Sequence, residues 1–147
     1  MQINDAGLDI IKLFEGFRAE PYLCPANVWT IGYGTTQYQD GARVSENDPS
    51  ITEEDAVALL LESATKFGRV IEGLTPVDLT ENQFSALVSF SYNVGTGNYR
   101  ASTLRSKLLR QEYNEAADEF PKWCRAGGRI LPGLVRRRAA ERALFTG

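Results

Sequence analysis

The stretch that decides the fold runs from Leu13 to Thr36 and reads LFEGFRAEPYLCPANVWTIGYGTT. A helical pattern that begins after Asn4 ends inside this stretch, at Glu15 and Gly16. The β-rich run Val28–Tyr33 follows, with prolines and glycines in the flanking sequence. We therefore expect one helix and then short strands joined by tight turns, too few to form a large sheet.

Helical patterns dominate after Pro49. Thr52 and Thr80 each begin a sequence that is typical of a capping box, and apolar residues follow at helical spacing. The predicted helices run from Thr52 to about Gly73, from Thr80 to Gly95, from Ser102 to about Tyr113, from Asn114 to Pro121 and from Pro132 to about Phe145. The sequence thus predicts one α+β domain, with short strands in a small lobe at about residues 15–50. The helical lobe is expected at about residues 51–147, with the first helix packed on it.

Composition excludes several kinds of chemistry. The 147 residues include no histidine and two cysteines. Without histidine there is no Ser-His or Cys-His nucleophile pair and no imidazole metal ligand. Acid–base chemistry near neutral pH must then use carboxylates, a thiol, lysine or tyrosine. Two cysteines also cannot build a four-thiolate zinc site.

The net charge of −3 is unevenly distributed along the chain. Residues 1–99 contain 5 Lys or Arg against 14 Asp or Glu, whereas residues 100–147 contain 11 against 5. A basic region suggests an anionic partner such as nucleic acid, a membrane or a cell-wall polymer. The alternative is that the two parts pack on each other with compensating charges. Because no nucleic-acid-binding motif is visible in this acidic chain, we expect no nucleic-acid partner.

The chain carries no recognisable targeting or membrane-spanning pattern. Residues Met1–Asp5 lack the basic and apolar regions of a signal peptide, so we expect none. The longest apolar run, Ala56–Leu61, is far shorter than the roughly 20 residues that span a bilayer. We therefore expect no stable insertion into a membrane.

Glu15 is the first candidate for a catalytic group. It lies at a helix end, directly before the strand-rich region. Aromatic neighbours would shield its carboxyl from water and suit it to general-acid catalysis; the candidates are Phe14, Phe17, Trp29 and Tyr33. The alternative is a solvated charge at the end of a helix, which is the more common role of such a residue.

The whole stretch resembles the phage-type lysozymes, or endolysins, of glycoside hydrolase family 24. Their signature is Glu-Gly at a helix end, an Asp or Cys after eight intervening residues, and a Thr after five more. Glu15, Cys24 and Thr30 occupy these positions. The resemblance continues in order through Phe90–Gly95, Ser102–Leu104, Trp123–Gly128 and Leu131–Arg138. It therefore covers essentially the whole chain.

This resemblance implies a lysozyme-like fold with a glycan cleft between the two lobes. It implies hydrolysis of the β-1,4 bond between N-acetylmuramic acid and N-acetylglucosamine in bacterial peptidoglycan, which lyses the host cell. Glu15 would be the acid. Cys24, where most of the family has Asp, would be the nucleophile or electrostatic partner, and Thr30 would position water or substrate. No metal and no cofactor are implied.

The resemblance also implies where the protein acts. It would be a monomer that stays in the host cytoplasm until a holin permeabilises the membrane, and would then reach the peptidoglycan in the periplasm. Two alternatives stay open. One is a lytic transglycosylase that uses Glu15 alone, and the other is a non-catalytic cell-wall-binding module in which Cys24 has abolished turnover.

The cysteines and the arginine run each allow more than one interpretation. Cys24 is expected to act as a thiolate; the alternatives are a neutral thiol, which is a poor base, and a small buried apolar side chain. Cys124 is expected to pack in the core beside Trp123, and a disulfide between the two cysteines is the minor alternative. In the run Arg136–Arg138, we expect one arginine to point inward and pair with acidic residues near the first helix. The others are expected to be solvated.

Overall fold

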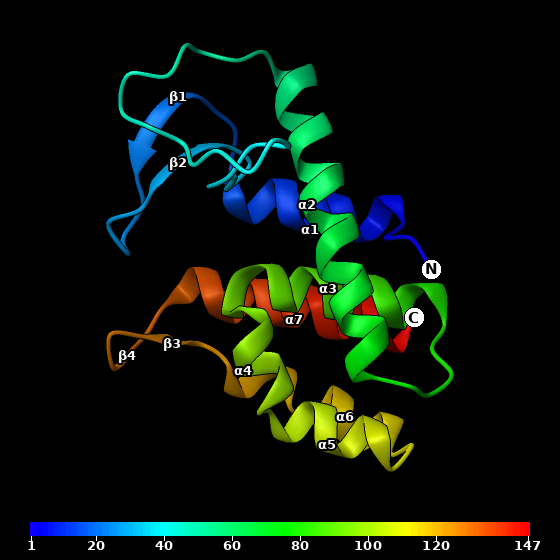
Figure 1. Ribbon diagram of the computed structural model, residues 1–147. Coiled ribbons are helices and arrows are strands. Elements are labelled where there is room, and N and C mark those ends of the chain that lie inside the picture. Colours follow the sequence, from blue (N-terminus) through cyan, green and yellow to red (C-terminus); the bar gives the residue numbers. More distant parts are fainter.

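The computed structural model describes residues 1–147 and confirms the α+β class (Figure 1). Its elements are α1 (Asp5–Glu15), β1 (Arg18–Leu23), β2 (Trp29–Gly32), α2 (Glu53–Leu74), α3 (Glu81–Val94), α4 (Thr96–Arg100), α5 (Thr103–Leu109), α6 (Tyr113–Ala117), the 3-10 helix η1 (Phe120–Lys122), β3 (Arg125–Ala126), β4 (Arg129–Ile130) and α7 (Pro132–Thr146). None of the helices is both long enough and apolar enough to cross a membrane.

The helix starts follow the local signals of the sequence. The Asn4 side chain caps α1 by accepting a hydrogen bond from the Gly7 N–H at 3.0 Å. Thr52 and Thr80 form complete capping boxes at the starts of α2 and α3. These signals depend on neighbours three residues apart, so the sequence predicts them correctly.

The region after Gly95 differs from the prediction. The helix expected from Ser102 to about Tyr113 ends at Leu109, and Gln111 follows with a φ of 59°. A left-handed residue interrupts helical hydrogen bonding, so the chain restarts as α6. Short α4 and the hairpin of β3 and β4 were not predicted, and Pro121 lies within η1 instead of ending a helix.

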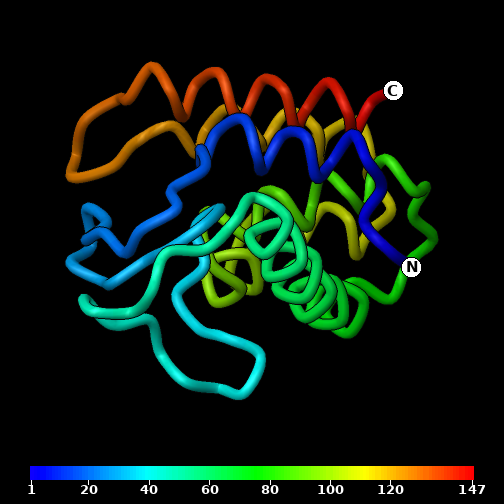
Figure 2. The backbone as a smooth tube through the Cα atoms, turned by 90° about the horizontal axis from the view of Figure 1, so that it is seen from above, coloured from blue at the N-terminus to red at the C-terminus, as the bar shows by residue number.

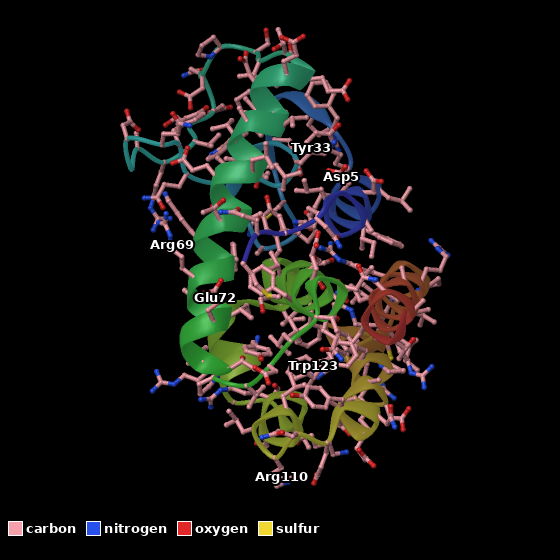
Figure 3. All side chains as sticks on the ribbon, turned by 90° about the vertical axis from the view of Figure 1, so that its right-hand side faces the viewer. Asp5, Tyr33, Arg69, Glu72, Arg110 and Trp123 are labelled. Atoms are coloured by element: carbon pink, nitrogen blue, oxygen red, sulfur yellow. The ribbon has the colours of Figure 1, made fainter.

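Helix α3 is the centre of the molecule. Every residue from Phe84 to Ser91 is buried, and α1, α2 and α7 all pack on this helix. Figure 2 shows α1 and α7 lying side by side, in blue and red-orange, although they come from opposite ends of the chain. Around this centre the helical lobe has an aromatic core, with the Trp123 ring 5.4 Å from the Phe90 ring (Figure 3). This packing brings the end of α1 next to both the strands and the start of α7.

The strands form a small antiparallel hairpin beside α2. In this hairpin Tyr22 lies opposite Thr30 and Leu23 opposite Trp29. Strand β2 packs against α2, and its residues Thr30–Gly32 are buried. The hairpin therefore has a fixed position relative to the helices.

Helix α2 packs closely on α3 at Gly68. A Cβ atom at this position would lie 2.9 Å from the Phe84 ring carbon Cζ, and Phe84 is fully buried. Gly73, in the same helix, has no other residue within 4 Å of an added Cβ. The two glycines therefore form a matched pair.

We predict opposite effects of alanine at these two positions. Gly68→Ala should lower the free energy of unfolding by about 1–3 kcal/mol, because the new methyl group overpacks the contact with Phe84. Gly73→Ala should raise it by about 0.5–1 kcal/mol through better helix propensity. Urea denaturation measures both values. Equal effects of the two substitutions would contradict the close packing at Gly68.

Candidate active site

The Glu15 carboxyl is held at the end of α1. Gly16 ends the helix with a φ of 72°, and its N–H donates to the Lys12 carbonyl at 3.0 Å. The Glu15 side chain is 20% exposed, and its Oε2 accepts a hydrogen bond of 2.7 Å from Nη1 of Arg137 in α7. The predicted contact between the arginine run and an acidic residue near the first helix is therefore confirmed.

Arg137 is itself held by a buried network. Its Nη2 donates to the Ser89 carbonyl at 3.1 Å, and its Nε donates to Glu141 Oε2 at 3.3 Å. The Ser89 hydroxyl donates to the same oxygen of Glu141 at 2.6 Å. Burial raises the pKa of the Glu141 carboxyl, and the guanidiniums of Arg138 and Arg137 oppose that rise. These hydrogen bonds fix the direction of the Arg137 side chain.

The burial of Arg138 differs from the prediction. Arg138 is completely buried, whereas we expected only one arginine of the run to point inward. Its Nε lies 2.7 Å from Glu141 Oε1, at an angle that does not make a hydrogen bond, and its guanidinium lies 5.0 Å from the centre of the Phe90 ring. Pairing with a buried carboxylate and an aromatic face offsets part of the cost of burying this charge. Arg136 is exposed, as expected.

The other oxygen of Glu15 lies against the backbone of Gly34. A Cβ atom on Gly34 would be 2.7 Å from Glu15 Oε1, and the φ of Gly34 is 79°. Both the backbone conformation and the close approach therefore require glycine here. The carboxyl is held on one side by Arg137 and is approached on the other by the turn after β2.

Two tyrosines surround the carboxyl. Burial raises the pKa of Tyr22, and the charge of Glu15 adds to the rise. The pKa of Tyr92 is raised well above its ordinary value by the same two causes in the same order. The Tyr92 hydroxyl donates to the Tyr33 carbonyl at 2.6 Å, which ties α3 to the turn that holds Gly34.

The hairpin presents Cys24 and Thr30 near this carboxyl. Side chains alternate along a strand, so Tyr22 and Cys24 share one face, and Leu23 points to the other face and is exposed. Thr30 lies directly opposite Tyr22, and the Cys24 N–H donates to the Val28 carbonyl at 3.1 Å. The charges of Glu15 and Cys24 both raise the pKa of the Tyr22 hydroxyl. Glu15, Cys24 and Thr30 are therefore all close to Tyr22.

The surroundings of Cys24 favour its thiolate. A backbone hydrogen bond from Val28 is the largest influence and lowers the pKa of the thiol; desolvation opposes this effect, and the Ala26 backbone and the Thr30 hydroxyl support it. Both cysteines are free. Cys124 is half-buried beside Trp123, so it is not fully in the core as expected.

Thr30 is buried, with 3% of its surface exposed. Its hydroxyl donates to the Val28 carbonyl at 2.8 Å and also acts on the Cys24 thiol. One hydroxyl proton cannot serve both acceptors at once. The hydroxyl therefore lies between the Val28 carbonyl and the Cys24 sulfur.

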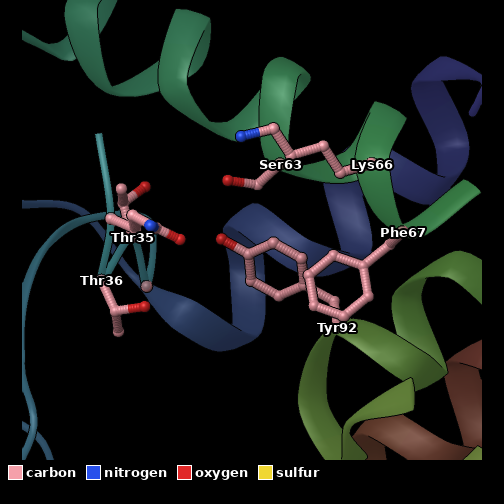
Figure 4. A pocket seen from close by; sticks show the side chains of 8 residues that line it. Thr35, Thr36, Ser63, Lys66, Phe67 and Tyr92 are labelled. Carbon is pink, nitrogen blue, oxygen red and sulfur yellow. The ribbon is translucent and has the colours of Figure 1, made fainter. Parts of the chain in front are cut away.

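Pockets border Glu15 on two sides. One of about 330 Å³ includes Gly34 and Tyr92 in its wall (Figure 4). Another of about 320 Å³ includes Phe14, Glu15 and Arg137. Phe14 is therefore a neighbour of the carboxyl, as the sequence suggested. No group of three or more acidic or thiol side chains is arranged to hold a metal ion.

Comparison with known proteins identifies the family. The chain matches the Phage lysozyme family over residues 12–141. It belongs to that family. The predicted resemblance is thus confirmed, and the family assignment agrees with the α+β architecture.

Relatives of this phage lysozyme are similar over nearly its whole length. It is 42% identical to an endolysin of Bacillus phage B103, over 99% of this chain and 54% of the relative. The chain therefore spans about half the length of that protein. It is 40% identical to an endolysin of Acyrthosiphon pisum secondary endosymbiont phage 1, over 99% of this chain and 98% of the relative.

Among solved structures, an endolysin from Escherichia coli O157:H7 phage FAHEc1 superposes with a TM-score of 0.87. It is 34% identical, over 99% of this chain and 93% of that one.

Several groups of the site were not predicted. Tyr22 and Gly34 lie inside the opening stretch, but no spacing rule gave them a role. Ser89 and Tyr92 are on a helix that is buried on all sides from Phe84 to Ser91, so the local pattern does not show which face meets Glu15. Glu141 had one usable signal, because it follows Arg137 by four residues on a helix.

We predict that Gly34→Ala lowers activity, because its methyl group displaces the Glu15 carboxyl. The matched control is Gly95→Ala, since Gly95 has a φ of 91° but no atom within 4 Å of an added Cβ. Both substitutions should cost about 1–2 kcal/mol of stability through backbone strain. Only Gly34→Ala should also lower kcat well beyond that control in a cell-wall turbidity assay. An equal loss of kcat in both variants would contradict the contact with Glu15.

Proposed function

We propose that this phage lysozyme is an endolysin. It would hydrolyse the β-1,4 bond between N-acetylmuramic acid and N-acetylglucosamine in bacterial peptidoglycan. The observation that carries the proposal is the Glu15 carboxyl, which is held by Arg137 at a helix end with pockets on both sides. The endolysins to which the chain is similar support the same activity.

Glu15 is the proposed general acid. Glycoside cleavage passes through an oxocarbenium-like transition state and needs a proton on the leaving oxygen. Since Arg137 occupies Oε2, the proton to be donated belongs on Oε1, the oxygen beside Gly34. The guanidinium balances the negative charge that the carboxyl carries after donation.

Cys24 is the proposed anionic partner of the developing cation. Its lowered pKa increases the thiolate fraction near neutral pH. Direct attack would form a carbon–sulfur bond as the glycosidic carbon–oxygen bond breaks, with the Glu15 proton leaving on the departing oxygen. Water would then displace the sulfur and give its proton to Glu15. If the thiolate instead activates water, the product has inverted configuration, so the anomer of the first product separates the two routes.

Thr30 is proposed as a positioning residue. Its buried hydroxyl contacts both the Val28 carbonyl and the Cys24 thiol, so it fixes the sulfur at the end of the hairpin. This supports a role of Thr30 in placing the thiolate, in addition to the role in positioning water or substrate that the resemblance implies.

The setting of the reaction is also a proposal. The protein would act as a monomer on glycan strands, after a holin has permeabilised the host membrane and given it access to the periplasm. The phage origin of its relatives supports this sequence of events.

We predict that Glu15→Gln lowers turnover on purified peptidoglycan by at least about 10²-fold, because the amide cannot donate the proton. The exposed Glu20→Gln is the control and should keep normal activity. Mass spectrometry of the wild-type digest should show reducing ends. Anhydro-muramic ends would identify a lytic transglycosylase, and no cleavage at all would leave a binding module.

The pH profile of wild-type activity should contain a rising limb that marks formation of the Cys24 thiolate. Because the pKa of Cys24 is lowered, the midpoint of this limb should fall below the ordinary pKa of a thiol. Cys24→Asp should remove this rise, since an ordinary aspartate is ionised above about pH 5. Cys24→Ser should lose most activity at every pH, and Cys124→Ser is the control. A serine variant as active as the wild type would exclude the thiolate.

A further inference from the structure

The hairpin of β3 and β4 extends from the helical lobe into solvent (Figures 1 and 2). In this hairpin Arg125 lies opposite Ile130 and Ala126 opposite Arg129, and all four residues are exposed. The two turn residues, at positions 127–128, are glycines with φ values of 59° and 77°. Positive φ at both positions is the geometry of a tight two-residue turn, so the hairpin has a defined shape. Both of its faces are open to a partner.

The exposed charges on this hairpin and at the start of α7 are positive. Arg125 and Arg129 are on the strands, and Arg136 is an exposed residue of α7. None of these three arginines forms an ion pair. The sequence has no acidic residue at positions 120–140 that could pair with them. The three guanidiniums are therefore available to an anionic partner.

The start of α7 adds to the positive potential. This helix begins at Pro132 with no acidic residue in its first turn and no side-chain cap, so its dipole is not offset by a carboxylate. The Arg136 guanidinium lies near the same turn, since its Nη2 is 4.0 Å from a Cβ atom built on Gly133. Like charges that gather on one surface repel one another and lower stability. An anionic partner would remove this cost.

Exposed aliphatic side chains accompany these arginines. Ile130 lies opposite Arg125 and is 55% exposed, and Leu131 follows it and is 40% exposed. In a segment that binds a membrane surface, guanidiniums contact lipid phosphates while aliphatic groups enter the boundary of the acyl chains. A soluble phosphate polymer supplies anions, but it offers no apolar layer for the aliphatic side chains. The combination therefore favours a lipid surface.

The charge of the rest of the chain favours one orientation on such a surface. Residues 1–99 contain 5 Lys or Arg against 14 Asp or Glu, so an anionic membrane repels this part of the protein. Residues 100–147, which include the hairpin, contain 11 against 5. The protein should therefore approach an anionic surface with the hairpin first.

We propose that the β3–β4 hairpin and the start of α7 bind the surface of an anionic phospholipid bilayer. Arg125, Arg129 and Arg136 would contact lipid phosphates, and Ile130 would enter the boundary of the acyl chains. This is binding at the surface, without a spanning segment. It goes beyond the proposed cleavage of peptidoglycan and does not depend on it, because the lipid is bound outside the pockets at Glu15.

Co-sedimentation with lipid vesicles tests the proposal on the complete chain. The wild type should bind vesicles made of equal parts of phosphatidylglycerol and phosphatidylcholine at low salt. It should not bind vesicles of phosphatidylcholine alone, and added salt should weaken binding because it screens exposed charges. No binding to the anionic vesicles at low salt would overturn this inference and leave the proposed cleavage untouched.

Substitution of the three arginines tests the surface itself. Arg125→Gln, Arg129→Gln and Arg136→Gln should each weaken binding to the anionic vesicles about fivefold, the effect of one basic side chain near an anionic membrane. The triple variant should bind about 10²-fold more weakly. Its thermal unfolding temperature should not fall, since none of the three side chains is in an ion pair.

A matched triple variant controls for net charge. Arg43→Gln, Arg69→Gln and Arg100→Gln remove the same charge from three exposed arginines that are outside the hairpin and α7 and are also in no ion pair. This variant should keep most of the vesicle binding. An equal loss in both triple variants would show attraction by net charge alone and would overturn the assignment to the hairpin.

Ile130→Ser separates a lipid surface from a phosphate polymer. It should weaken vesicle binding about three- to fivefold, because a partly buried aliphatic side chain is lost, and should leave binding to long-chain inorganic polyphosphate unchanged. Leu61→Ser is the control, since Leu61 is 43% exposed on α2, and it should change neither. If the arginine variants weaken both kinds of binding and Ile130→Ser weakens neither, the surface binds a phosphate polymer and the lipid proposal is overturned.

Discussion

The ion pair between Arg137 and Glu15 is the interaction on which the site depends. It joins two side chains that are 122 residues apart in sequence, one at the end of the first helix and the other near the start of the last helix. Arg137 is in turn bound to Glu141 and to the Ser89 carbonyl, so α1, α3 and α7 meet at one buried group of charges. Removing one member of such a group leaves an unpaired buried charge, which typically costs about 3–5 kcal/mol. The stability of the helical lobe and the position of the proposed acid are therefore linked.

The same ion pair explains the uneven charge of the chain only in part. Of the ion pairs in the structure, Arg137 with Glu15 is the one that joins the acidic residues 1–99 to the basic residues 100–147. Most other basic side chains of the second part pair locally, as Lys107 does with Glu119, or stay exposed, and Arg105 donates to the Leu74 carbonyl at 2.7 Å. Compensation of charge between the two parts is thus limited to a single ion pair, and this ion pair holds the proposed catalytic acid.

The hairpin and the turn at Gly34, which surround this ion pair, are positioned by different interactions. The strand register of the hairpin positions the Cys24 sulfur and the Thr30 hydroxyl. The Cys24 N–H donates a hydrogen bond to the Val28 carbonyl across the turn, and Thr30 lies opposite Tyr22. The turn at Gly34 approaches the carboxyl because glycine permits both the positive φ and the short contact. The proposed acid and thiolate are therefore positioned by different elements, the end of α1 and the hairpin, which the turn at Gly34 brings together.

Local sequence determined the features that depend on near neighbours. The capping boxes at Thr52 and Thr80, the end of α1 at Gly16 and the spacing of Glu15, Cys24 and Thr30 involve short segments, whose hydrogen bonds and turns are set by adjacent residues. The spacing made the family recognisable before any contact was known. Interruptions such as the left-handed Gln111 were missed, because that residue type carries no strong turn signal. Contacts between distant residues were decided by tertiary structure alone: the burial of Arg138, the approach of Tyr92 to Glu15 and the pocket that joins Thr35 to Lys66. Their positions depend on how whole helices pack, and helix packing is set by many apolar contacts at once, so no single motif can specify it.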